Sequence, residues 1–560
     1  METSNTSLEN LPAELLYRIV DYLDSQTILL SFRYVCRRFR SIAENANRFE
    51  LDLTLIKSKD DFERLCHLIN PAHLLSLTLI DNEETPGQIQ HFFSRFQMEQ
   101  FTQLRSLTLI NIEWMILNVL FPDSLPFSLK KLCLILKGKR NRFTLEHLSH
   151  LLFQTFLEQL ALNTFAHAID ELIVSVHSEL RCLTIGICTY NEYQNILRYC
   201  PQLRTLVLDE CWISDDSPID HDSLHRLTSL TLKDTNRSIE QLHHLLRLTP
   251  MLQFLQIINA PSTSSSLIDG SHWQRFIEKN LNYLTQFQFV FYHKSLQAYY
   301  SMNDIEPSMK SFRTPFWIDE KHWFIHCDYV KYLHQTRLYS IPYPLASFDL
   351  YFDNENMSLS TSNKPGLLST LFDRIQQLTI HFNQININQL KQYILNHFND
   401  KQTPLLRHVT ELELNLNDFW CLELFDFLDD LVQLTSIDRI KLNVFSQSKL
   451  DILPLLFART YRLKSLSILS SANAENHDID VQTVCDLIPI YLEHLTLRVQ
   501  KPKDMQYVLR RLPSLASVTF FVPFHRKIDV QEMTIWLEKL GCRYVCTETD
   551  ETLSFWLSKI

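Results

Sequence analysis

The sequence predicts an α/β protein in which a small three-helix unit precedes a solenoid, a curved parallel sheet with helices along its outer side. Three observations support this fold class. One six-residue apolar pattern recurs along most of the chain, the segments between its copies have helical apolar spacing, and residues 11–42 show the spacing of short amphipathic helices. The length of 560 residues exceeds an ordinary single domain, which favours a repeat array.

The recurring pattern is apolar-x-x-apolar-x-apolar, and its most complete copy reads Leu-Arg-Thr-Leu-Val-Leu from Leu203. From Leu180 to Leu252 the copies begin 23, 24 and 25 residues apart, and elsewhere the steps reach 34 residues. The copies begin at Leu74, Leu104, Leu129, Leu157, Leu180, Leu203, Leu227, Leu252, Leu284, Ile375, Val409, Ile437, Leu463, Leu492 and Leu515.

Each copy is expected to form a short strand whose apolar residues point inward, because successive side chains of a strand alternate between its two faces. One such strand buries little until its neighbours stack on it, so the units fold together as a solenoid. Pro201 and Pro250 end the helical segments just before the next strand. A flat parallel sheet would also alternate strands with helices, but it would not require the same six-residue apolar pattern in so many successive strands. The pattern resembles leucine-rich repeats, and Cys211 stands where that family places Asn or Cys.

Breaks in the period suggest five regions. We expect helices at 1–48, a first block of repeats at 49–300, an irregular aromatic-rich insertion at 301–370, a second block at 371–530, and a C-terminal cap of helix and strands at 531–560. Within the insertion, aromatic and β-branched residues bounded by prolines at 311–329 and 338–343 suggest two extended strands that pair with the solenoid wall.

Residues 8–45, called the hook below, have the pattern of three short helices. Pro12 suits the first position of a helix, where a missing N–H costs nothing. Three apolar groups follow, at 15–23, 28–32 and 35–42. Helices this short cannot bury all their apolar residues against each other, so another protein or the rest of the chain must cover some of them.

The hook resembles an F-box in Leu11-Pro12, Glu14-Leu15, Ile19, Tyr22-Leu23, Ile28 and Val35-Cys36-Arg37, followed by an aromatic at Phe39. Ala13 and Phe39 depart from the commoner acidic residue and Trp. The resemblance implies docking on the Skp adaptor of a cullin-RING ubiquitin ligase. The adaptor-binding residues it implies are Leu11, Pro12, Leu15, Ile19, Leu23, Val35 and Cys36.

Composition narrows the possible functions. The net charge of −11, with scattered Lys and Arg, offers no basic face for nucleic acid. Only six glycines occur, and their spacing excludes phosphate-binding loops and a nucleophile elbow. No apolar run spans a bilayer, no secretory signal is visible, and the 12 cysteines lack paired spacing. We therefore expect reduced thiols, a cytosolic or nuclear location, no cofactor, no nucleic acid and no membrane.

Candidate metal ligands are few. His322 and His326 stand four residues apart beside carboxylates, but their aromatic neighbours favour a strand, on which positions four apart lie too far from each other. Cys542 and Cys546, with His494 elsewhere, match no zinc pattern. The pair His243-His244 is interpreted as solvated. We predict no metal site and no catalytic residue.

The inner face of a solenoid is its usual binding surface. Glu411 and Glu413 on one predicted strand face Arg439 and Lys441 on the next, so this bipolar set is a candidate target-binding patch, although cross-strand pairing explains it equally well. Other residues expected on this face are Ser106, Thr108, Ser229, Thr231, Ser465, Ser467, Thr496 and Thr519.

The sequence therefore suggests a non-catalytic, substrate-recognition subunit of a ubiquitin ligase that binds the Skp adaptor, and through it a cullin, as well as an unknown target protein. The alternative is a leucine-rich-repeat interaction scaffold with no ubiquitin role, in which the hook only caps the array. Exposure of the apolar face of residues 11–36 discriminates between the two hypotheses.

Overall fold

The computed structural model is described for most of the chain. The described residues are 8–45, 49–121, 125–126, 128–137, 157–163, 179–212, 225–233, 238–259, 265–294, 302–352, 357–361, 371–382, 406–416, 423–444, 453–470, 480–499, 501–522, 530–549 and 551–558.

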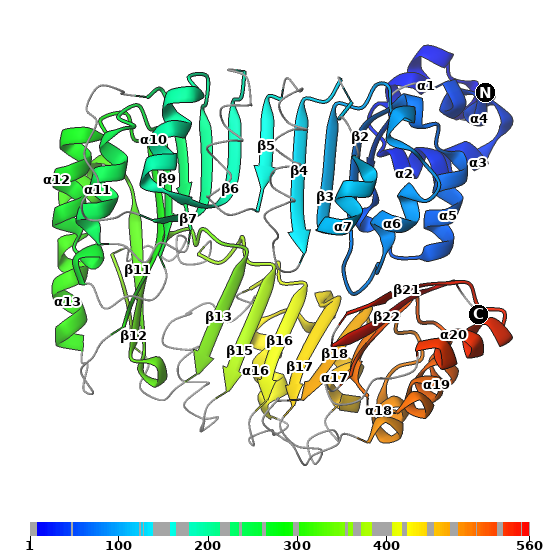
Figure 1. The fold of residues 1–560 in the computed structure, drawn as a ribbon. Coiled ribbons are helices and arrows are strands. Elements are labelled where there is room, and N and C mark those ends of the chain that lie inside the picture. Colours follow the sequence, from blue (N-terminus) through cyan, green and yellow to red (C-terminus); the bar gives the residue numbers. More distant parts are fainter. Residues whose placement is uncertain are drawn as a thin grey trace, which may run out of the picture.

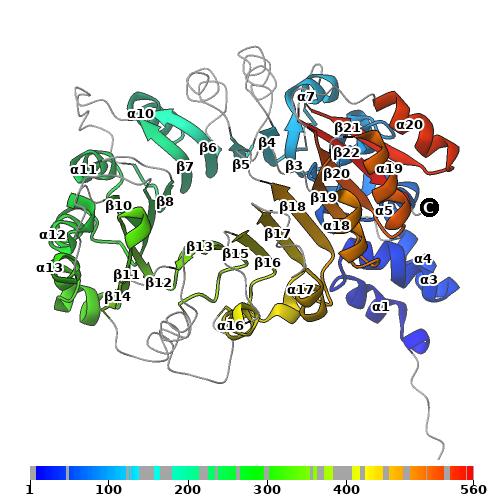
Figure 2. The ribbon, with the colours of Figure 1, turned by 90° about the horizontal axis from the view of Figure 1, so that it is seen from below.

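Two sheets form the inner wall of a superhelix, and the helices lie along its outer side (Figures 1 and 2). The first sheet contains, in spatial order, β1 (Phe49–Asp52), β2 (Leu74–Ile80), β3 (Ser106–Glu113), β4 (Lys131–Lys137), β5 (Gln159–Leu162), β6 (Cys182–Thr189), β7 (Thr205–Trp212), β8 (Ser229–Leu232), β9 (Phe254–Ile258), β10 (Gln286–Lys294), β12 (Gln335–Ile341), β11 (Phe324–Val330) and β14 (Met357–Ser360). The second contains β13 (Ser347–Phe352), β15 (Gln377–Phe382), β16 (Glu411–Leu416), β17 (Arg439–Val444), β18 (Ser465–Ser470), β19 (His494–Arg498), β20 (Ser517–Phe521), β22 (Thr552–Leu557) and β21 (Tyr544–Glu548).

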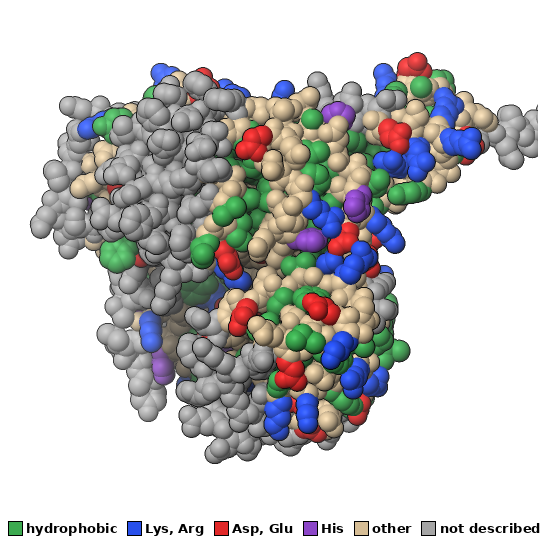
Figure 3. All heavy atoms as spheres, turned by 45° about the vertical axis from the view of Figure 1, so that its right-hand side comes forward, with side chains coloured by type: hydrophobic (Ala, Val, Ile, Leu, Met, Phe, Trp, Pro, Cys, Tyr) green, Lys and Arg blue, Asp and Glu red, His purple; other side chains and the backbone are tan. Residues whose placement is uncertain are grey.

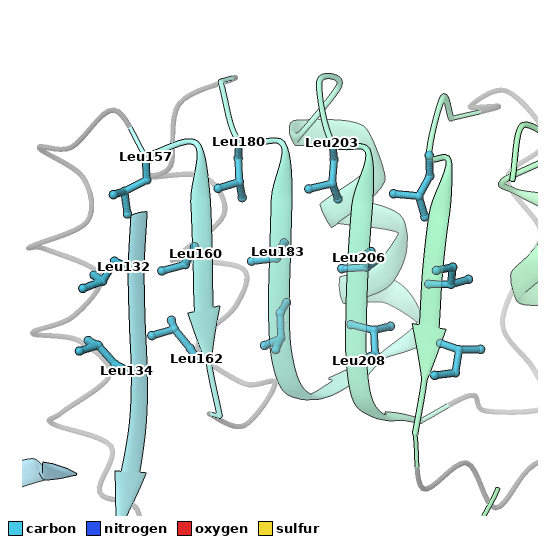
Figure 4. Packing of buried hydrophobic residues seen from close by; sticks show 14 of the residues in the cluster. Leu132, Leu134, Leu157, Leu160, Leu162, Leu180, Leu183, Leu203, Leu206 and Leu208 are labelled. Carbon is cyan, nitrogen blue, oxygen red and sulfur yellow. The ribbon is translucent and has the colours of Figure 1, made fainter. Parts of the chain in front are cut away.

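Neighbouring strands from β1 to β10 and from β13 to β20 are parallel, and the leucines stand in register. Leu132 lies opposite Leu160, Leu160 opposite Leu183, and Leu183 opposite Leu206 (Figure 4). All 15 residues at which the repeat was predicted to begin are buried. The predicted α/β solenoid is therefore confirmed, and its ladder of leucines forms the core between sheet and helices.

The outer helices are α5 (Lys59–Leu68), α6 (Gln88–Phe93), α7 (Trp114–Leu120), α10 (Tyr190–Tyr199), α11 (Ile239–Arg247), α12 (Gly270–Asn280), α13 (Met302–Ser311), α16 (Glu423–Leu431), α17 (Leu453–Arg459), α18 (Val481–Leu487), α19 (Pro502–Arg511) and α20 (Val530–Lys539). Local sequence fixes where several of them begin. Thr189 with Glu192, and Ser238 with Gln241, form capping boxes that satisfy backbone N–H groups at the first turns of α10 and α11.

Two strands extend the repeats beyond the predicted copies. β1 pairs with β2 ahead of Leu74. β13 begins the second sheet inside the segment 301–370, where we expected an insertion with two added strands but no further repeat. Leu345, Phe348 and Leu350 match the six-residue pattern, so the signal was present but had aromatic residues in leucine positions. In the rest of this segment, β11 and β12 form an antiparallel hairpin that pairs with β10, so the two added strands are present. The first of them begins later than the expected 311, because residues 316–320 form a π-helical turn.

The superhelix makes about one turn, and its end returns to its beginning (Figure 2). In Figure 1 the strands from β2 to β9 form the upper part and the second sheet forms the lower part, while β11 and β12 of the first sheet reach down beside β13. The C-terminal strands lie below the first repeats. The Nε1–H of Trp556 donates to the carbonyl oxygen of Lys57 at 2.8 Å, across 499 residues of sequence. The chain is therefore closed on itself rather than open at both ends.

Candidate adaptor-docking face and inner face

The hook folds as predicted into short helices: α1 (Ala13–Val20), α2 (Ser25–Thr27), a π-helical turn (Ile28–Phe32), α3 (Arg33–Val35) and α4 (Arg37–Asn45). Pro12 is the residue before α1 rather than its first residue, with φ −52° and ψ 149°. Asp24 caps α2 by accepting from the backbone N–H of Thr27 at 2.7 Å, and hydrogen bonds from Thr27 lower the pKa of this carboxyl.

One set of apolar side chains in the hook faces the protein. Leu16, Leu29, Phe32 and Phe39 are buried, and the rings of Phe32 and Phe39 stack with centroids 4.4 Å apart. These residues are continuous with the core of the first repeats. At the same boundary the N–H of Glu50, on β1, donates to the Ser25 hydroxyl at 3.1 Å. The hook therefore caps the first repeat.

A second set of apolar side chains remains uncovered. Leu15 is 43% exposed and Val35 is 61% exposed, and Pro12 is exposed as well. The other four residues assigned to adaptor binding, namely Leu11, Ile19, Leu23 and Cys36, are half-buried and pack against the core. The seven residues thus divide into three that are free to meet a partner and four that mainly support them.

Three tyrosines that the sequence argument did not assign to the site enlarge this surface. Tyr22 is 91% exposed, Tyr34 59% and Tyr17 38%. Tyr17 lies on α1 with Leu15, Tyr34 lies on α3 with Val35, and Tyr22 lies in the turn after α1. We group these exposed rings with Pro12, Leu15 and Val35 as one candidate adaptor-docking face. Their spacing along the helices was visible in the sequence, but their exposure depends on which side of each helix the first repeat covers.

The candidate target-binding patch takes part in closing the superhelix. Lys441 contacts Glu411 at 2.6 Å, as cross-strand pairing suggested. Arg439 lies 3.9 Å from Glu411, but its closer contact is Glu84 at 2.9 Å, in the loop after β2. Glu413 accepts instead from Asn443 on β17 at 2.8 Å. Figure 3 shows basic, acidic and histidine side chains gathered where the upper and lower parts meet.

The serine and threonine side chains expected on the inner face divide in the same way. Ser106, Thr108, Ser229 and Ser465 are half-buried. Thr231, Ser467, Thr496 and Thr519 are buried, and the loop after β2 explains the burial of Thr496, whose hydroxyl donates to Glu83 at 3.1 Å. Part of the inner face of the second sheet is thus covered by the chain itself.

The histidine and cysteine candidates have separate partners. His322 precedes β11 with a left-handed φ of 55°, so only His326 lies on the strand. His326 lies 3.1 Å from Asp328, and Tyr339 donates to Asp328 at 2.7 Å. Burial alone would raise the pKa of Asp328, but His326, Tyr339 and nearby Arg337 outweigh it and hold the pKa at about 2.

His243 and His244 are both half-buried rather than fully solvated as we expected, and the ring of His243 stacks on Phe276 with ring centroids 3.8 Å apart. His494 bonds the Ser517 hydroxyl at 2.9 Å, and the Cys542 thiol lies 3.6 Å from the carbonyl oxygen of Ser558. Within the described ranges, no group of three or more His, Cys, Asp or Glu side chains is arranged to hold a metal ion. In the same part of the chain, no helix has the length and apolar character needed to cross a membrane.

The register of the strands and the outer helices define a leucine-rich-repeat protein with a helical module ahead of its first repeat. Comparison with protein families matches residues 8–48 to the F-box-like family. The chain therefore carries an F-box-like domain followed by a leucine-rich-repeat superhelix. A search of curated proteins found no match.

Three solved structures illustrate the similarities found. An internalin from Listeria monocytogenes is 12% identical with a TM-score of 0.21, over 76% of this chain and 96% of that one. A chain from the Rad7 and Elc1 complex in yeast is 13% identical with a TM-score of 0.22, over 84% and 86%. A leucine-rich-repeat protein from Leptospira interrogans is 12% identical with a TM-score of 0.19, over 80% and 96%. Scores this low carry no argument about shape, so the fold assignment rests on the strand register.

Proposed function

We propose that this protein is the substrate-recognition subunit of a Skp–cullin–F-box ubiquitin ligase, acting in the cytoplasm or nucleus. The hook docks on the Skp adaptor, which joins it to a cullin, and the superhelix holds a target protein. Other subunits transfer ubiquitin, so this chain acts without a nucleophile, an acid–base pair or a cofactor. Its contribution is to raise the effective concentration of a target lysine near the transfer site.

The observation that carries the proposal is the uncovered apolar face of the F-box-like domain. Pro12, Leu15 and Val35 remain exposed although the hook already packs on the first repeat. Exposed aliphatic residues and the exposed rings of Tyr22 and Tyr34 in one small module have the composition of an interface anchor. A module that served only as a cap would not need this second face.

The scaffold hypothesis has its own support, because the hook does cap the array through Leu16, Leu29 and Phe32. The two roles use different faces of the same helices, so they are compatible. Only binding of the adaptor separates the ligase subunit from a scaffold with no ubiquitin role.

We place target binding on the inner face, where Glu413 and Lys441 remain partly exposed. Glu411 and Arg439 are assigned a smaller part there, since the Glu411 side chain is buried and the guanidinium of Arg439 contacts Glu84. Charge reversal at Glu413 and Lys441 should weaken capture of a target without changing binding of the adaptor.

The deciding experiment is co-elution of the full-length chain with a purified Skp adaptor on size exclusion. Removing residues 1–48 would expose the core beneath the hook, so point variants are the better probe. Leu15→Asp and Val35→Asp should each abolish the complex. The matched control is Leu455→Asp on α17, because Leu455 is also 43% exposed but α17 lies in the lower part of the molecule, away from the hook (Figure 1).

A complex that forms with the wild type and with Leu455→Asp, but with neither hook variant, supports the ligase role. If the folded wild-type chain forms no complex, the ligase role is withdrawn and the scaffold remains. Circular dichroism of each variant establishes that loss of binding is not loss of folding.

A further inference from the structure

The C-terminal hairpin of β21 and β22 belongs to two hydrophobic cores at once. Trp556 is buried in the core of the first repeats and the hook, and Val545 packs against that core. Leu553 and Phe555 are buried in the core of the second sheet. Successive side chains of a strand point to opposite faces, so a two-stranded hairpin is able to present one apolar face to each part of the superhelix.

The face toward the first repeats is closely fitted. The ring of Trp556 meets Phe62 of α5 edge to face, with centroids 5.0 Å apart. Gly87 has a left-handed φ of 72°, and a Cβ added there would lie 2.8 Å from the Cγ1 of Val545. A side chain at position 87 would therefore clash with the hairpin as well as strain the backbone.

Charged groups surround this apolar contact. Arg543, at the start of β21, binds Glu63 of α5 at 3.1 Å and Asp60 at 3.5 Å. Glu63 also contacts Lys59, whose ammonium group is buried and lies 3.4 Å from the Ser558 hydroxyl. Burial opposes ionisation of Glu63, but Lys59 and Arg543 outweigh it and lower the pKa of this carboxyl. The ion pairs therefore tie the hairpin to α5 at neutral pH.

The loop after β2 makes a second contact of the same kind. Glu84 binds Lys57 at 2.8 Å and Arg439 at 2.9 Å, so one buried carboxylate joins the first repeats to β17. The Ser517 hydroxyl of β20 donates to the carbonyl oxygen of Glu83 at 3.0 Å. Two separate regions of the second sheet are thus fixed to the same short stretch of the first repeats.

The helix α5 that meets the hairpin also contacts the hook, at its π-helical turn Ile28–Phe32. Leu16, Leu29 and Phe32 of the hook lie in the same core as Phe62 and Trp556. In an open solenoid each repeat is stabilised only by its neighbours, so the last repeat has no effect on the first. Here the last strands supply part of the core on which the hook rests.

We propose that the C-terminal hairpin is a clasp that closes the superhelix and couples the stability of the hook to the packing of the hairpin on α5. The clasp holds the hook in a fixed position relative to the second sheet. Release of the hairpin loosens α5 and, through it, the hook. This coupling is a property of the chain alone and holds whether or not the hook binds an adaptor.

Hydrogen–deuterium exchange of the full-length chain tests the clasp without any partner. Trp556→Leu removes the aromatic contact with Phe62. Arg543→Glu places a third carboxylate beside Glu63 and Asp60. Because the side chain of Arg543 is 70% exposed, this second variant leaves both cores intact. Each should raise the exchange rate of protected amides in α5 and the hook about tenfold, which corresponds to a decrease of about 1.4 kcal/mol in the free energy of local opening.

The matched controls act on the second sheet alone. Phe555→Leu alters the residue before Trp556, whose side chain lies on the other face of the strand, in the core of the second sheet. Arg511→Glu reverses a comparable charge that pairs with Asp486 at 3.3 Å. Faster exchange in the hook with both clasp variants and with neither control supports the coupling. Unchanged exchange in the hook with Arg543→Glu, or equal acceleration by the controls, overturns it.

Discussion

Truncation of Leu15 and Val35 gives the sharpest quantitative test of the docking face. Complete burial of an aliphatic side chain contributes about 1.5–3 kcal/mol. Leu15 is 43% exposed and Val35 61%, so burying what remains contributes about 0.6–1.3 and 0.9–1.8 kcal/mol respectively. The two residues lie on different helices, so their effects should add, to about 1.5–3 kcal/mol. The double variant Leu15→Ala/Val35→Ala should therefore bind the Skp adaptor roughly 10- to 150-fold more weakly.

Isothermal titration of the purified adaptor into the full-length chain measures this difference, and chemical unfolding of the same samples measures stability. The double variant should change the free energy of unfolding by less than about 0.5 kcal/mol, because neither side chain belongs to the core. Leu455→Ala, with the same exposure as Leu15, should alter neither quantity. Leu16→Ala should instead destabilise the chain by about 2–5 kcal/mol, since Leu16 is fully buried.

Two results would refute the reasoning. Wild-type affinity of the folded double variant would mean that this face does not meet the adaptor. A loss of stability as large as that of Leu16→Ala would mean that Leu15 and Val35 support the fold rather than a partner.

Three further predictions concern stability. Burial lowers the pKa of His494 to about 4, so between about pH 6.5 and pH 4 the unfolded chain binds a proton that the folded chain does not. The free energy of unfolding should therefore fall by up to about 3 kcal/mol as the pH is lowered over this range. Urea titrations at about pH 7 and about pH 4.5 measure this fall, which should be smaller for His494→Asn. Gly87→Ala should lower the melting temperature, measured by calorimetry, because of its positive φ and the contact with Val545, whereas Gly541→Ala, also at φ 72° but with open space around it, should lower it less. Leu206→Ala, in the middle of the leucine ladder, should cost about 2–5 kcal/mol in the same assay, and a cost below 1 kcal/mol would show that the repeats repack around the cavity.

The repeats were predictable because their signal is local. Each copy of the six-residue pattern places its own leucines on the inner side of one strand, and stacking then requires only the next copy along the chain. The starting positions from Leu74 to Leu515 are buried for this reason. Where aromatic residues replaced leucine, as at Phe348, the same local signal was present but was missed.

The hook was predictable in its helices and only partly in its surface. Apolar spacing shows that Leu15 and Leu16 lie on an amphipathic helix, but not which of them the first repeat covers. The structure buries Leu16 and leaves Leu15 exposed. The exposure of Tyr22 and Tyr34 was hidden from the sequence for the same reason.

By itself, then, the amino-acid sequence determined the repeats, the helical hook and its F-box-like character, because all of these depend on residues close together in the chain. Only the tertiary structure decided that the superhelix closes, that Arg439 meets Glu84 across 355 residues, and that Trp556 reaches the core beneath the hook. The return of the last repeats to the first depends on the small rotation added at each repeat, summed over the whole turn. The residues of one repeat do not reveal that total rotation. The charged patch that contains Arg439 was therefore predicted as a binding surface, but in the structure it is in part a contact within the chain.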